Sequence, residues 1–167
     1  MSARVPPSVA AIAACCFATG VSPSTAAAGP EIIGEPGGED IVTVRRVQDA
    51  IDSRQELPIF PGISGNTAGS QGISMLRVVI PPGGRAKAHI HRGYETTIYL
   101  VQGRVLTRYG EGLAKSVVNE AGDFIYIPAD LPHRPENLSL TEPAIAIVAR
   151  TDPNEQESVE PYEVPGE

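Results

Sequence analysis

Proline and glycine divide this chain into short segments. The 167 residues include 16 prolines and 17 glycines, about a fifth of the total. Proline removes a backbone donor and breaks helix interiors, while glycine favours turns. The composition therefore disfavours long helices and favours many short strands joined by turns. A chain of this length is expected to form one main domain, with a core large enough to stand without disulfides.

The middle of the chain has the pattern of such strands. Apolar and β-branched stretches alternate with turn sequences rich in glycine, proline and aspartate. The predicted strands cover residues 41–44, 74–80, 86–91, 95–101, 104–109, 116–119, 124–127 and 144–150. One helical turn fits within 47–57, and the glycine-rich segment 61–72 is predicted to be a loop or hairpin. This number and spacing of strands predicts an all-β sandwich or small barrel.

Residues 1–28 resemble a secretory signal peptide. Arg4 is their only charge, an apolar run follows over 9–21, and Ala26 to Ala28 offer a small-residue cleavage site. We therefore expect a periplasmic or secreted protein; the alternative is a disordered leader on a cytoplasmic one. Cys15 and Cys16 are the only cysteines, so no disulfide framework is expected in the folded part. The apolar run over 9–21 is too short to span a bilayer. Residues 29–41 are expected to form a linker.

The acidic charge of the chain is concentrated at its C-terminal end. Residues 151–167 contain six acidic residues, three prolines and no basic residue, and the whole chain carries a net charge of −7. We expect this segment to be a solvated, extended tail. Nucleic acid and anionic membranes are unfavourable partners for such a charge.

The three histidines of the chain fall into a pattern suited to metal binding. His89 and His91 are two residues apart in a predicted strand, so their side chains share one face. Glu95 follows after a short turn, and His133 lies between two prolines that hold its backbone extended. Imidazole and carboxylate groups are common ligands of divalent metals. The same pattern is also compatible with surface or hydrogen-bonded histidines.

Two motifs in this region resemble those of the cupin superfamily. The first runs from Gly83 through His89, His91 and Glu95 to Gly103, and the second contains Gly122, Pro128, Asp130, His133 and Asn137. The resemblance covers residues 83–137 and, with flanking strands, 42–150. It implies an antiparallel double-stranded β-helix, the jelly-roll or cupin barrel. It also implies that His89, His91, Glu95 and His133 bind one divalent metal ion: Fe, Mn, Ni, Co or Zn.

The sequence departs from the cupin pattern at two positions. Seven residues separate Glu95 from Gly103, whereas the family usually has six. A shift by one residue would place Thr96 at the ligand position, but threonine is a poor ligand, so Glu95 is the preferred candidate. Asp130 replaces a usual glycine, and aspartate tolerates the left-handed backbone that such a corner needs.

Strand alternation supplies candidates for the wall of the cavity. If Glu95 points inward, Thr97 and Tyr99 do so too, and Arg77 and Tyr126 are further candidates to orient a substrate. The alternative is that these two tyrosines are core residues and Arg77 points to solvent. Asn137 is expected to fix the turn after His133 by hydrogen bonds.

These expectations favour a metal-dependent oxygenase, such as a dioxygenase, acting on a small organic molecule. A metal held by three imidazoles and one carboxylate would keep open positions for substrate and dioxygen. The alternatives are a metal-dependent sugar or uronate isomerase or epimerase, and a non-catalytic exported protein that binds metal or a small ligand. An apo structural barrel is the remaining alternative. Open edge strands would also allow a homodimer.

Overall fold

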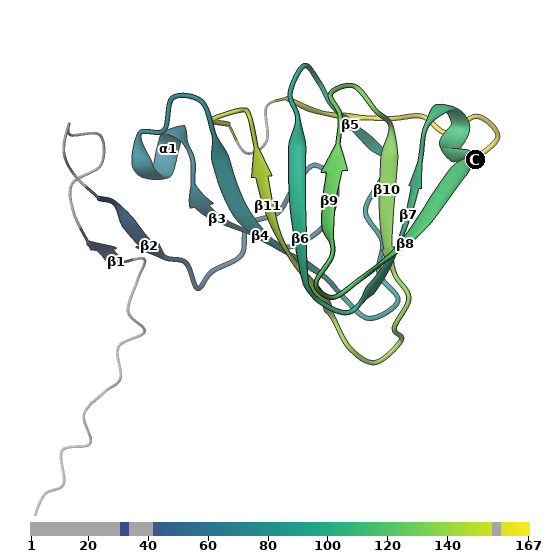
Figure 1. Ribbon diagram of the computed structural model, residues 1–167, viewed down its shortest axis with the longest axis horizontal. Helices are drawn as coiled ribbons and strands as arrows, with labels where there is room; N and C mark the ends of the chain where they lie inside the picture. Colours follow the sequence, from purple (N-terminus) through teal and green to yellow (C-terminus); the bar gives the residue numbers. More distant parts are fainter. Residues whose placement is uncertain (1–30, 34–41, 155–157) are drawn as a thin grey trace, which may run out of the picture.

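The computed structural model describes residues 31–33, 42–154 and 158–167. Two antiparallel five-stranded sheets make up most of this part of the chain (Figure 1), which confirms the predicted all-β double-stranded β-helix. The predicted signal segment 1–28 lies outside the described residues. Among those that are described, no helix has the length and apolar character needed to cross a membrane.

The elements are short and follow one another closely along the chain. In order they are β1 (Glu31–Ile33), β2 (Val44–Arg46), β3 (Ile59–Ile63), α1 (Gly65–Ala68), β4 (Ser74–Ile80), β5 (His89–His91), β6 (Thr96–Gln102), β7 (Arg104–Tyr109), the 3₁₀ turn η1 (Glu111–Leu113), β8 (Lys115–Glu120), β9 (Phe124–Ile127), β10 (His133–Asn137), β11 (Ala144–Arg150) and β12 (Val159–Pro161). One sheet has the order β3-β4-β11-β6-β9 and the other β12-β5-β10-β7-β8, while β1 pairs with β2.

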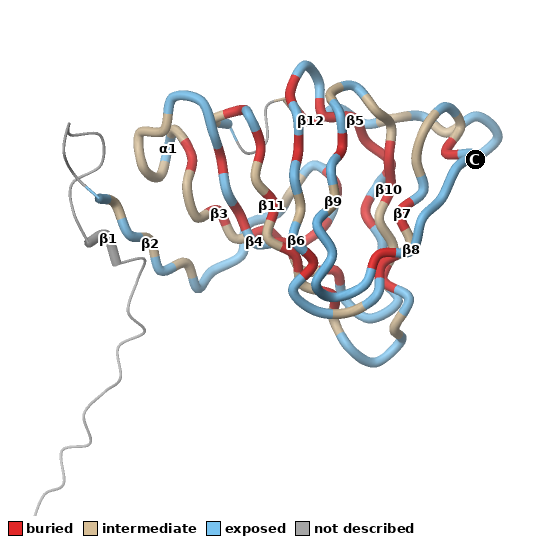
Figure 2. Tube along the Cα trace, in the orientation of Figure 1, coloured by how far each residue is buried: buried red, intermediate tan, exposed pale blue. Residues whose placement is uncertain are grey.

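The core lies between the two large sheets. Along β4 and β11 every second residue is buried, because successive side chains of a strand point to opposite faces. Val78, Ala146 and Leu100 are neighbours in register across three strands and form one inward row. Figure 2 shows these alternating buried positions along the strands. The main cluster contains Leu57, Ile59, Leu76, Val78, Ile80, Ala86, Leu100, Val105, Ala144, Ala146 and Val148.

Several strands have the predicted bounds, and others were not foreseen. β4, β7, β9 and β11 match their predictions residue for residue. β3 and β10 contain prolines and were not predicted, and the helical turn expected within 47–57 does not form. In β10 the carbonyl of Pro135 still accepts a hydrogen bond from Ala86 N (3.0 Å), so the proline does not end the pairing.

β6 contains a bulge near its end. On β11, Ile145 pairs with Gln102 and the next residue, Ala146, pairs with Leu100, so Val101 has no partner there. An extra residue of this kind interrupts the alternation of a strand. This explains the adjacent apolar residues Leu100 and Val101, of which the first is buried and the second 48% exposed.

The C-terminal segment packs against the barrel, so the expectation of a solvated tail is wrong. β12 pairs with β5, and the Val159 side chain is fully buried. Beyond β12, Tyr162 N donates to Ala88 O (2.9 Å), and the Tyr162 hydroxyl accepts from Gly112 N (2.9 Å). The acidic composition gave no sign of this strand, because its one apolar buried residue, Val159, is followed by the exposed Glu160 and Pro161.

Two polar residues fix the turns that flank β10. Asp130 has a left-handed backbone (φ +62°), as expected for a residue that replaces glycine, and its carboxylate accepts from Gly93 N. Asn137 is 2% exposed, and its amide donates to three carbonyls, which belong to Ile80, Pro81 and Glu142. The predicted structural role of Asn137 is therefore confirmed.

We expect Asn137→Ala to lower the free energy of unfolding by about 2–4 kcal/mol, because three buried or half-buried carbonyls lose their donor. Urea unfolding measures the change. Asn154→Ala is the control, since Asn154 is exposed and its loss should change stability by less than about 0.5 kcal/mol. Equal effects of the two substitutions would contradict this role of Asn137.

Candidate metal centre

Three buried histidines meet at one end of the barrel interior. His89 and His91 lie on β5, and His133 begins β10 directly opposite His89. One ring nitrogen of each lies within 4.8 Å of the corresponding atoms of the other two. The ring centroids are 4.2–5.1 Å apart, and all three residues are at most 3% exposed. The structure thus brings together all the predicted histidine ligands.

Hydrogen bonds at Nδ1 orient each imidazole ring. Nδ1 of His89 lies 2.8 Å from the carbonyl of Lys87, and Nδ1 of His133 lies 2.9 Å from that of Leu131. In both cases the carbonyl belongs to the residue two positions earlier in the chain. A carbonyl only accepts, so Nδ1 carries the proton and Nε2 keeps a free lone pair. Such a bond to the second nitrogen is typical of metal-binding histidines.

The third ring is oriented by a side chain that the prediction passed over. Thr96 is fully buried, and its hydroxyl lies 2.6 Å from Nδ1 of His91. The opposite atom, Nε2 of His91, is buried and has no hydrogen-bond partner. Leaving a buried acceptor unsatisfied costs about 1–3 kcal/mol, and a cation bound between the rings would satisfy it. This orphaned nitrogen fits a metal ion.

The electrostatics of the site also favour metal binding. Burial lowers the pKa of all three histidines, and that of His133 to about 4. The charges of the neighbouring histidines lower the pKa of His89 and His91 further, and Arg150 lowers all three. The rings are therefore neutral at pH 7, which is the form that binds metal.

Glu95 does not join the histidines, so its prediction as a ligand is wrong. Its side chain is exposed, and its carboxylate accepts a 2.5 Å hydrogen bond from the Tyr126 hydroxyl. The alternation of β6 explains the error: Thr96 points inward, so the residues on either side of it point outward. The usual six intervening residues before Gly103 would have placed Thr96, rather than Glu95, at the inward position.

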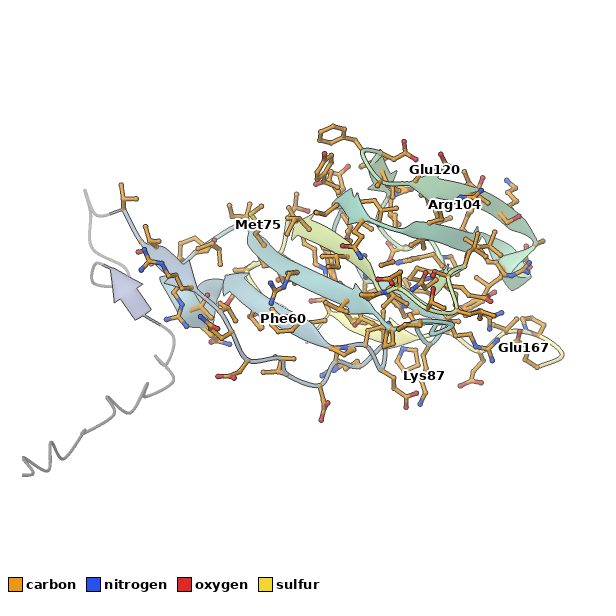
Figure 3. All side chains as sticks on the ribbon, turned by 90° about the horizontal axis from the view of Figure 1, so that it is seen from below. Phe60, Met75, Lys87, Arg104, Glu120 and Glu167 are labelled. Atoms are coloured by element: carbon orange, nitrogen blue, oxygen red, sulfur yellow. The ribbon has the colours of Figure 1, made fainter. Side chains whose placement is uncertain are left out.

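The other predicted cavity residues lie on the outer face of the same sheet. Thr97, Tyr99 and Tyr126 are exposed, and Arg77 stacks over Phe60, with its guanidinium carbon 4.0 Å from the ring centroid. Thr97 and Tyr99 alternate with Thr96 as Glu95 does, so the same error placed them inside. Tyr126 pairs with Thr97, and Arg77 lies in register with Tyr99 through Ile147, so both lie on that outer face too. Figure 3 shows Phe60 and Met75 on strands β3 and β4 of this sheet.

A small apolar cavity extends from the histidines into the barrel. Its volume is about 70 Å³, and most of its wall consists of aliphatic side chains from both sheets. Apart from the three histidines, the polar or charged residues that line it are Gln55, Thr107 and Arg150. No carboxylate, lysine or tyrosine is among the described residues that line it. Arg150 ends β11 and was not predicted; its place next to the site follows from its register with Thr96.

Tyr94 completes the surroundings of the histidines. Its ring stacks on that of His91, with centroids 5.1 Å apart and planes inclined by 12°. Burial raises the pKa of Tyr94 to about 12, so the phenol keeps its proton at neutral pH. The guanidinium carbon of Arg150 lies 6.0 Å from the centroid of the same ring.

A comparison with known protein families gives the fold its name. A family model described as "Cupin domain" matches residues 76–150, which include all three histidines. Residues 76–150 therefore form a cupin domain. No curated protein matches this cupin in sequence.

Solved structures similar to this cupin include two oxalate decarboxylases. That of Lactobacillus farciminis, in a formate complex, is 26% identical with a TM-score of 0.58, and the match covers 68% of this chain and 33% of that one. That of Bacillus subtilis, at pH 4.6, is 25% identical with a TM-score of 0.55, covering 64% and 28%. The matched part is thus about a third of the length of these enzymes. Another similar structure of the Bacillus subtilis enzyme comes from a study of its Mn(II) centres.

A third similar structure is closer in size. It is an uncharacterised double-stranded β-helix protein from Klebsiella pneumoniae, 17% identical with a TM-score of 0.55. The match covers 68% of this chain and 90% of that one. At this identity it supports the fold alone.

We expect Thr96→Val to weaken metal binding by about 10- to 100-fold, because His91 loses the partner that orients its ring. Competition titration of Co(II) or Zn(II) against a chelator measures the affinity. Thr97→Val is the matched control, since Thr97 is the next residue of β6 and is exposed. An unchanged affinity of Thr96→Val would contradict the role of this hydroxyl.

We expect the metal-free protein to lose stability as the pH falls from about 6.5 to about 4. The pKa of His133 is about 4 in the folded chain, against an ordinary value of 6.5, so the unfolded chain binds more protons in this window. Stability therefore rises with pH, and His133 alone accounts for about 3 kcal/mol.

Urea unfolding in the presence of a chelator, at several pH values, measures this dependence. The difference between the wild type and His133→Gln isolates His133 from the carboxylates that titrate in the same range. Parallel pH profiles of the two proteins would contradict the expectation.

Proposed function

We propose that this cupin is a metal-dependent oxidoreductase of the oxygenase type that acts on a small organic molecule. The observation that supports this most is the convergence of three neutral imidazoles, without a carboxylate, at the end of an apolar cavity. His89, His91 and His133 would hold the ion through their Nε2 atoms. A redox-active divalent ion bound there would supply electron transfer between substrate and dioxygen.

The charge of the site favours an anionic substrate. Three neutral imidazoles leave the full charge of a divalent ion uncompensated, and Arg150 adds a positive charge to the same cavity wall. A carboxylate or enolate oxygen would offset part of the charge of the ion. Octahedral coordination would leave three positions open, enough for a bidentate substrate and one further small ligand.

The cavity limits the size and polarity of the substrate. A water molecule needs roughly 10–15 Å³ of such volume, so about 70 Å³ accommodates a molecule of only a few non-hydrogen atoms. The aliphatic wall excludes bulk water and strengthens the electrostatic interactions within the site. The residues of this chain thus bind, orient and dehydrate the reactants.

The alternatives receive different degrees of support. An isomerase or epimerase needs a base to move a proton, and the described cavity wall holds no carboxylate, lysine or tyrosine. Decarboxylation of a small dicarboxylic acid is the second candidate, supported by the similarity to two oxalate decarboxylases. A non-catalytic metal binder would share the same histidine site.

The signal-like residues 1–28 support our proposal that the protein is exported, with a cytoplasmic location as the alternative.

We expect the purified, untagged protein to contain at least about half an equivalent of a divalent metal. After anaerobic loading with Fe(II) or Mn(II), it should consume dioxygen with a member of a panel of small carboxylic acids, diols and enols. His133→Ala should lose both metal and oxygen uptake, because one of only three ligands is removed. Glu95→Gln should retain metal and activity within about twofold, since Glu95 lies outside the site.

The outcome of this assay separates the candidate functions. Release of CO₂ from oxalate without oxygen consumption would favour the decarboxylase. Stoichiometric metal without turnover of any compound would favour a binding protein. A metal-free wild type that binds no added metal would overturn the proposal.

A further inference from the structure

Three arginines gather on the outer face of the sheet that carries the histidines. Arg134 follows His133 in β10 and therefore points to the opposite side of the strand. Arg108 on β7 is its direct cross-strand neighbour, and Arg85 forms an isolated bridge with Glu136, two residues further along β10. These side chains line a polar cavity of about 450 Å³, separate from the metal centre.

Like charges in this register need a compensating anion. Positive side chains directly opposite each other on one face of an antiparallel pair repel and destabilise the sheet. Arg134 adds a second cost, since only 10% of its side chain is exposed and its Nε is buried without a hydrogen-bond partner. The chain as a whole is acidic, with a net charge of −7, so this concentration of arginine contrasts with the rest of the molecule.

The carboxylate of Glu167 supplies part of that compensation. Its two oxygens accept from Arg134 Nη1 (2.6 Å) and Nη2 (2.9 Å) in a bidentate pair. Hydrogen bonding from Arg134 lowers the pKa of Glu167, and the charges of Arg85 and Arg108 lower it further. Neither Arg85 nor Arg108 forms an ion pair with any residue in the part of the chain that the structure describes.

We propose that this arginine cavity is a binding site for a small dianion, such as phosphate or a short dicarboxylate. Guanidinium groups bind both kinds of anion through paired hydrogen bonds. The side-chain carboxylates that line the cavity with the three arginines are those of Glu136 and Glu167. A dianion in place of the Glu167 side chain brings one more negative charge to the arginines, and Glu167 acts as an internal competitor for the site.

The position of Glu167 makes this competition reversible. Its side chain is about half exposed, and Figure 3 shows it at the far end of the C-terminal segment. β12 and Tyr162 hold the preceding part of that segment independently, through backbone pairing with β5 and the hydrogen bond from Gly112. The last residues can therefore leave the arginines while the rest of the segment stays in place.

Calorimetric titration of the full chain with inorganic phosphate, and separately with succinate, tests the proposal at constant ionic strength. Glu167→Ala should bind at least one of the two about five- to tenfold more tightly than the wild type, because the competing carboxylate is gone. Which anion binds more tightly identifies the source of the ligand. Arg85→Gln and Arg108→Gln, each made in the Glu167→Ala protein, should weaken binding about tenfold or more. Both arginines are exposed, so the fold should tolerate these changes.

Arg104→Gln is the matched control. Arg104 lies on the same face of β7, but it pairs with Glu120 on β8 and does not line the cavity. It should leave anion binding unchanged. The absence of saturable binding of both anions by Glu167→Ala would overturn the proposal. So would binding that survives both cavity substitutions or is lost equally in Arg104→Gln.

Discussion

The metal centre depends on the pairing of β5 from both sides. This strand has only three residues, all of them buried, and two of them are histidines of the centre. On one side His133 of β10 pairs with His89, and on the other Val159 of β12 pairs with His91. Because a three-residue strand cannot hold its own backbone groups in place, these two neighbours fix where both imidazoles point.

The regular alternation of inward and outward residues along single strands made much of the fold predictable. β4 and β11 combine apolar inward positions with turn residues at both ends, so local pattern and tertiary structure agree. β10 and β12 were not predicted because proline and acidic residues are weak strand formers on their own. β10 pairs with β7 and β5, and β12 pairs with β5. These partners are distant in sequence, and no local pattern indicates them.

The sequence could predict those parts of the candidate site that depend on residue type alone. The histidines are few and fall into recognisable spacings, and the structure brings all three together as the spacing predicted. Glu95 was chosen for its chemistry, but the orientation of a strand residue depends on its register. The structure places Thr96 inward, where its hydroxyl contacts a ring of the centre in place of a carboxylate. The result is a centre with three neutral ligands and a net charge one unit higher than the four-ligand prediction.

The late position of β12 in the chain has a consequence for biosynthesis. During synthesis β5 leaves the ribosome long before Val159, so the edge of β5 that β12 covers stays open until β12 has been made. An unpaired edge strand can pair with other chains and aggregate. The barrel of a nascent chain therefore keeps one open edge until this segment has been made and pairs with β5.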